Sequence, residues 1–137
     1  MFLKELNKEE SICFLNLVSI FTKVDNKFAK EEKVLVHEYK EELGINSEEI
    51  QTMEYDDIIK KLNNSSDKSK LIIYFELVGL ALVDGDYENE EVDFLEKISK
   101  DLNISRAKKI QVANCFYNFS EKDGEEKLEE MAKDIIG

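Results

Sequence analysis

The sequence contains no proline and only five glycines in 137 residues. These are the residues that most often end or bend a helix, so nothing in the composition interrupts long helices. Apolar residues recur at spacings of three and four, and no stretch alternates for long between apolar and polar residues. A chain of this length suits one domain with its own hydrophobic core. We therefore expect a single all-α domain of about seven helices over residues 1–137.

Side chains that commonly carry catalysis are scarce. There is one histidine, His37, and the two cysteines, Cys13 and Cys115, lie far apart in the sequence. A lone histidine removes the usual Ser-His and Cys-His nucleophile pairs, and there is neither a glycine-rich phosphate loop nor a zinc motif. We expect His37 on the surface and both cysteines as buried thiols in a reducing compartment. The sequence argues against an enzyme.

Basic residues are also few, with 19 of them against 31 acidic ones and a net charge of −12. This charge opposes binding to nucleic acid and to anionic membranes. The most apolar stretch, Leu71 to Val83, is shorter than the roughly 20 residues that a spanning helix needs, and the N-terminus has no signal-peptide pattern. We expect a cytoplasmic protein that acts on a protein partner and reaches membrane complexes only through it.

Helix starts are marked by capping boxes, in which an Asx side chain and a glutamate three residues later bond to each other's backbone. The three boxes pair Asn7 with Glu10, Asn46 with Glu49, and Asp123 with Glu126. With the apolar periodicity they predict helices over about 7–24, 30–43, 46–63 with a break near 55, 67–83, 89–102, 105–119, and from 123 onward. In the second of these helices, we expect Val34, Leu35 and Tyr39 to face inward.

An acidic pattern occurs twice in the chain. Residues 24–32 read Val-Asp-Asn-Lys-Phe-Ala-Lys-Glu-Glu, and residues 83–91 read Val-Asp-Gly-Asp-Tyr-Glu-Asn-Glu-Glu, 59 positions further on. Similar turns follow at the same offset, at 43–45 and 102–104. An internal repeat of this kind indicates duplicated architecture. We predict two helix–loop–helix repeats, at about 8–63 and 67–119, followed by a C-terminal helix at about 124–136.

Carboxylates of the two copies are candidate ligands for a divalent cation, because calcium takes six to eight oxygen ligands. The candidates are Asp84, Asp86, Glu90 and Glu91 in the second copy, and Asp25 and Glu32 in the first. Glu76, two turns earlier on the apolar helix, can add an oxygen. The loop is not an EF-hand, because Asn89 and Leu95 stand at the required glycine and glutamate positions. Asn26 and Lys27 weaken the first copy, which places a site in the second copy or between the two.

A purely structural interpretation explains the same residues. Glu91 falls in the first turn of a helix, where the macrodipole favours an acid. Asp84 can accept backbone N–H bonds in the preceding turn. The repeated pattern would then build the same helix corner twice. The sequence does not decide between a cation site and a purely structural helix corner.

The second copy resembles the TerB-like family, the tellurite-resistance B group that is related to the N-terminal domain of the DjlA co-chaperones. The resemblance is carried by residues 80–85 (Leu-Ala-Leu-Val-Asp-Gly), by 90–91, by Leu95 and Ile98, and by 102–105 (Leu-Asn-Ile-Ser). It implies a helical bundle of two repeats that serves bacterial stress responses such as tellurite, phage and colicin resistance. It also implies divalent-metal binding, calcium in particular, with Asp84 and Glu91 at the motif positions.

A second function is compatible with the charge. A small acidic inhibitor or immunity-type protein could cover a basic site on its partner, since opposite charge speeds such associations. Such a charge mimic needs acidity but no repeat. The duplicated acidic pattern therefore favours the cation-binding stress module.

Overall fold

The computed structural model describes residues 2–24, 32–82, 89–118 and 124–137, without the side chains of residues 32, 33, 35, 89, 118 and 124–127. Within these ranges every regular element is helical, which confirms the predicted all-α class. The elements are η1 (Leu3–Glu5), α1 (Lys8–Val24), α2 (Glu32–Leu43), η3 (Ser47–Glu49), α3 (Tyr55–Leu62), α4 (Asp67–Leu82), α5 (Asn89–Asp101), α6 (Arg106–Asn118) and α7 (Gly124–Ile136). No helix in the described ranges is both long enough and apolar enough to cross a membrane.

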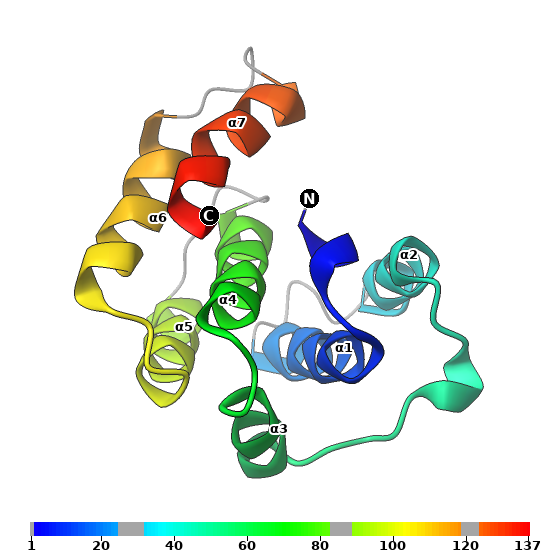
Figure 1. The fold of residues 1–137 in the computed structure, drawn as a ribbon. Helices are drawn as coiled ribbons and strands as arrows, with labels where there is room; N and C mark the ends of the chain where they lie inside the picture. Colours follow the sequence, from blue (N-terminus) through cyan, green and yellow to red (C-terminus); the bar gives the residue numbers. More distant parts are fainter. Residues whose placement is uncertain (1, 25–31, 83–88, 119–123) are drawn as a thin grey trace.

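The helices form a bundle in which α1, α4 and α5 lie between two outer parts (Figure 1). On one side α6 and α7 lie side by side, and on the other side α2 packs against α1. The α3 helix packs on α1, and the N-terminal turn η1 contacts both α2 and α4. The two acidic patterns border the inner helices, since the first follows α1 and the second lies between α4 and α5.

Two of the predicted capping boxes are present. The Asn7 backbone N–H donates to Glu10 Oε1 at 2.9 Å, and the Glu10 N–H donates to Asn7 Oδ1 at 2.8 Å. The Asn46 N–H donates to Glu49 Oε2 at 3.2 Å, and this box opens η3. These bonds satisfy N–H groups that a helix start would otherwise leave without a partner. The third box begins at residue 123 and lies outside the described residues.

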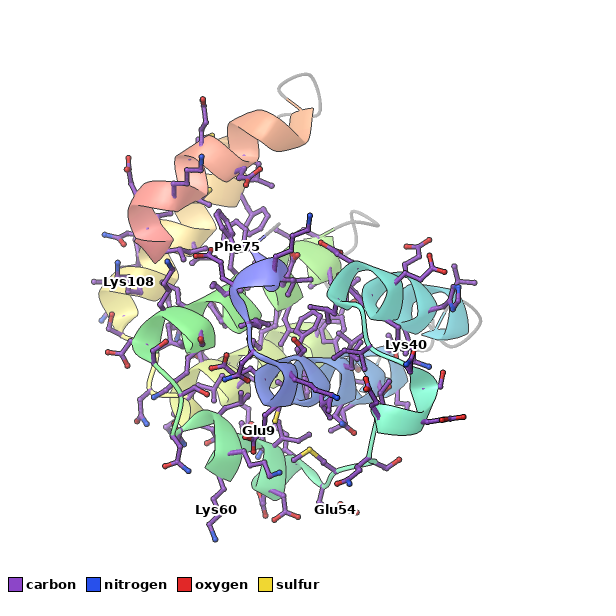
Figure 2. All side chains as sticks on the ribbon, turned by 45° about the vertical axis from the view of Figure 1, so that its right-hand side comes forward. Glu9, Lys40, Glu54, Lys60, Phe75 and Lys108 are labelled. Atoms are coloured by element: carbon purple, nitrogen blue, oxygen red, sulfur yellow. The ribbon has the colours of Figure 1, made fainter. Side chains whose placement is uncertain are left out.

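The core is built around α4, whose side chains are buried on nearly all sides from Ser69 to Ala81. Phe75 of α4 makes an edge contact with Phe2 and stacks on Phe116 of α6, with ring centroids 6.0 and 4.7 Å apart (Figure 2). A Cβ atom on Gly79 would stand 3.2 Å from the Phe116 ring, so this glycine lets α6 approach closely. One aromatic cluster therefore joins η1, α4 and the α6–α7 pair.

The structure locates the predicted break in residues 46–63 and corrects one prediction about α2. Residues 50–54 have no helical structure and separate the short η3 turn from α3, which begins at Tyr55. Val34 does not face inward and is 58% exposed. The inner side of α2 instead carries Val36, Tyr39 and Leu43, which pack partly buried against the core. The error at Val34 concerns an outer helix of the bundle, where tertiary neighbours rather than periodicity decide burial.

The duplicated turns have the same backbone geometry. Gly44 after α2 and Asn103 after α5 both have positive φ, at 68° and 59°. The next residue donates in each case to the carbonyl five positions earlier, from Ile45 at 3.0 Å and from Ile104 at 2.8 Å. This left-handed helix ending suits glycine best and asparagine next. The wider two-repeat architecture stays a prediction.

Candidate functional site

The acidic positions predicted to bind a cation fall into two groups in the structure. Asp25, Asp84 and Asp86 lie outside the described residues, and Glu32 begins α2 with a side chain that is not described. Glu90 and Glu91, in the first turn of α5, are described in full. The local geometry of the candidate site can therefore be built from these two glutamates and the helices around them.

Glu91 is completely buried, with 0% of its surface exposed, whereas the neighbouring Glu90 is exposed. A charged carboxylate loses several kcal/mol or more of hydration when it is buried alone, so buried carboxylates are protonated, paired, or bound to a metal ion. The positive end of α5 favours a negative charge at this position, but that preference also holds for an exposed residue and does not require burial. Burial of Glu91 is therefore the feature that the helix-corner interpretation does not by itself require.

The surroundings of Glu91 join the helix ends that border the two acidic patterns. Phe94, one turn further along α5, contacts Phe21 of α1 with ring centroids 5.9 Å apart. Phe21 is fully buried and lies one turn before α1 ends at Val24. The last turn of α1 and the first turns of α5 are therefore neighbours. The first acidic pattern follows the former in sequence, and the second leads into the latter.

Glu76 of α4 is half-buried and acts on the neighbouring helix α2. Burial raises the pKa of the Tyr39 phenol, and the negative charge of Glu76 raises it further. The Tyr39 ring also meets the Phe14 ring edge-on, at 5.1 Å between centroids. The Glu76 carboxylate thus contributes negative potential on the side of α4 that faces Tyr39 and α2.

Among the described side chains, no group of three histidine, cysteine, aspartate or glutamate residues is arranged to hold a metal ion. Three of the six predicted ligands lie outside that search, and the side chain of Glu32 does too. Glu91 is thus the described residue around which the predicted cation site can be argued.

The other candidate groups lie where the sequence placed them. His37 is exposed and its Nε2 lies 3.1 Å from Glu41 Oε1. Cys13 and Cys115 are buried free thiols. Burial raises the pKa of the Cys13 thiol to about 11 and also raises that of Cys115. A high pKa keeps both sulfurs protonated near neutral pH and therefore weakly nucleophilic.

Tyr55 was missed by the sequence analysis, because the run Tyr55-Asp56-Asp57 resembles an ordinary solvated helix face. In the structure, the Tyr55 hydroxyl donates to Asp101 Oδ2 at 2.7 Å, and the Lys97 ammonium lies 4.4 Å from the centre of its ring. Asn63 Nδ2 donates to the Asp101 carbonyl at 3.1 Å. These contacts join α3 to the end of α5 across about forty residues of sequence, which no local pattern could indicate.

We compared the chain with protein-family models, with curated proteins and with solved structures, and none of them matches. The function is therefore argued from the residues and their geometry.

Proposed function

We propose that this protein is a non-enzymatic, TerB-like stress-response module that binds a divalent cation, most readily calcium, at the start of α5 and acts through a protein partner in the cytoplasm. The observation that supports the cation site most directly is the complete burial of Glu91. This glutamate occupies a motif position of the resemblance, and a bound cation is one of the few partners that stabilise an ionised carboxylate away from water.

The composition of the donor set suits a hard cation. Calcium is bound by carboxylate and carbonyl oxygens, and Glu91 can supply one or two of them. Asp84 and Asp86 precede it in sequence, and Asp25 follows the helix whose last turn packs beside α5. Carboxylates from both copies are the further ligands in this proposal. The cation would hold the ends of α1 and α5 together and so link its binding to the arrangement of the bundle.

The non-enzymatic part of the proposal is supported by the state of the usual catalytic groups. The histidine is exposed beside Glu41, and burial raises the pKa values of both thiols. A protein partner with a basic surface is supported by the net charge of −12, which speeds association with positively charged proteins. The same charge supports the second candidate, an acidic inhibitor, which differs in needing no cation.

The test is a thermal melt of metal-free protein with and without millimolar calcium, with magnesium as the ion control. A ligand that binds only the folded state stabilises it by about 2.7 kcal/mol at 100 times its dissociation constant. We expect calcium to raise the melting temperature of the wild type and not that of Glu91→Gln or Asp84→Ala. Glu90→Gln is the matched control, because it removes the neighbouring charge from an exposed site, and it should keep the calcium response.

The Glu91→Gln variant separates the two interpretations of this residue. If its carboxylate binds a cation, Glu91→Gln should remove the calcium-induced rise in melting temperature, whatever its effect on the stability of the metal-free protein. If the carboxylate is instead paired within the protein, Glu91→Gln should be less stable by several kcal/mol and calcium should have no effect on the wild type. The second result would reject the cation site and favour the inhibitor.

A further inference from the structure

A cavity of about 260 Å³ lies at the other end of the α4–α5 pair from Glu91. It is bordered by the first turn of α4, by residues 102–105 between α5 and α6, and by the last turn of α7. Because it borders both the start of α4 and the end of α5, these two helices run in opposite directions. Glu91, the third residue of α5, is therefore separated from the cavity at Leu102 by most of the helix, a rise of about 16 Å.

Three lysines and one aspartate are the charged residues that line this cavity. Lys70 is only 7% exposed, although lysine is seldom buried to this degree. Its Nζ lies 3.8 Å from Asp67 Oδ1, which is beyond hydrogen-bond distance, and the Asp67 side chain is fully exposed to water. Across the described part of the chain, the Lys70 ammonium donates no hydrogen bond. An ammonium that ends a largely buried side chain, with its donors unused among the described residues, favours an acceptor within the cavity.

The other two lysines are fixed around the same space. Lys108 Nζ donates to the Ile135 carbonyl at 2.6 Å and so holds its charge at the end of α7. Lys68 forms an ion pair with Glu5 at 2.8 Å, with both side chains about half exposed. Figure 2 shows Lys108 on the side of the bundle formed by α6 and α7. Positive charge is thus concentrated at one place in a chain whose net charge is strongly negative.

Two helices also begin at the cavity. Ser66 Oγ accepts the Ser69 N–H at 3.1 Å at the start of α4, and Ser105 Oγ accepts the Lys108 N–H at 3.2 Å at the start of α6. Helix starts carry partial positive charge and spare N–H donors, which suits phosphate groups. Apart from Asn103, the remaining lining is aliphatic, including Leu71 of α4. The site therefore combines anion recognition with a small apolar wall.

We propose that this cavity binds a phosphate monoester with a short apolar group, and that Lys70 is its principal charged ligand. The volume of about 260 Å³ is slightly below the roughly 300 Å³ at which drug-sized ligand pockets begin, which restricts the ligand to a small molecule. The phosphate could belong to a soluble molecule or to a lipid headgroup, and both present the same dianion to Lys70 and Lys108. This inference is independent of the cation site, because the two lie at opposite ends of α5.

The probe is phenyl phosphate, with inorganic phosphate as the minimal anion, added to the whole protein at constant ionic strength. Two-dimensional NMR of the amide groups would follow the titration. We expect saturable shifts confined to residues 66–71 and 102–108, with tighter binding of phenyl phosphate than of inorganic phosphate. Lys70→Met should weaken binding about tenfold or more, as expected when a charged hydrogen bond is lost. Lys60→Met, an exposed α3 residue well apart from Lys108 in Figure 2, is the matched control and should bind like the wild type.

Sedimentation with vesicles that contain phosphatidic acid separates the two sources of phosphate. Saturation by phenyl phosphate without sedimentation assigns the site to a soluble ligand, and sedimentation that Lys70→Met abolishes assigns it to a headgroup. Shifts spread over the whole surface, or equal affinity in wild type and Lys70→Met, would overturn the proposal. If Lys70→Met does not fold, Lys108→Met tests the same cavity. The wild-type titration also tests the proposal without any variant, through which amide signals shift.

Discussion

Helices α2 and α5 occupy equivalent places in the duplicated pattern, yet the protein buries them very differently. At three equivalent pairs of positions, α5 and its end are buried while α2 is only partly so. The pairs are Leu95 (2% exposed) with Val36, Ile98 (0%) with Tyr39, and Leu102 (0%) with Leu43. The α5 helix packs against both α1 and α4, whereas α2 packs on α1 and η1 at the edge of the bundle. Two helices with the same sequence pattern are therefore buried to different extents, because different elements pack against them.

The C-terminal ends of α2 and α5, in contrast, have the same backbone structure. Gly44 and Asn103 adopt the same left-handed conformation and close the same hydrogen bonds. These bonds span five residues, so they depend on local sequence and not on what packs against the helix. The comparison separates local backbone structure, which is alike at the two turns, from packing, which is not.

The largest expected effect comes from truncating the equivalent apolar side chains of α5 and α2. Leu95→Ala should lower the free energy of unfolding by about 2–5 kcal/mol, because it opens a cavity among fully buried neighbours. Val36→Ala should cost roughly 1 kcal/mol, because its site is partly open to water and the side chain is smaller. Urea denaturation of both variants measures the difference. Equal losses would mean that α2 is packed as tightly as α5.

The next largest loss of stability should come from removing the contact between Tyr55 and Asp101 at the end of α5. Tyr55→Phe removes the hydrogen bond to Asp101 and should cost about 1.5 kcal/mol at neutral pH. Burial raises the Tyr55 pKa, as does the hydrogen bond to Asp101. Because the folded-state pKa is raised, this contribution is present below the unfolded value of about 10 and is lost as the pH rises above it.

The expected result for Tyr55 is therefore a gap between wild type and Tyr55→Phe that narrows above about pH 10. Denaturation across pH 7–11 would show it. Tyr39→Phe in α2 is the comparison for burial without a hydrogen bond to Asp101; because burial also raises the Tyr39 pKa, its gap should narrow above about pH 10 as well. A gap that stays constant with pH would show that the loss in Tyr55→Phe comes from packing alone.

The smallest effects should come from the two turns. Gly44→Ala places a Cβ at a φ of 68° and should cost about 1 kcal/mol, although nothing within 4 Å would clash with it. Asn103→Gly should change stability little or raise it by a few tenths of a kcal/mol, because glycine is the better residue at this conformation. Chemical denaturation of the two variants measures the change in the free energy of unfolding. It tests whether the preference for glycine at a positive φ holds at both turns. A gain for Gly44→Ala would contradict it.

The candidate sites were predictable from sequence to different degrees. The duplicated acidic pattern made Glu91 a candidate ligand because its position in the chain repeats. Its complete burial could not be predicted, since it depends on where α1 and α4 pack. The lysine cavity left no signal at all, because Lys70, Lys108 and residues 102–105 are brought together only when α4, α5 and α6 assemble. The contact of Tyr55 with Asp101 was hidden for the same reason.

The sequence by itself determined the helical class, the helix starts at Asn7 and Asn46, and the shared turn after α2 and α5. These features depend on hydrogen bonds and apolar spacings within a few residues, so they are encoded locally. Only the tertiary structure decided that Val34 is exposed, that Glu91 is buried, and that the largely buried Lys70 lines a cavity. Burial is a property of the neighbours that a residue acquires, and those neighbours come from distant parts of the chain.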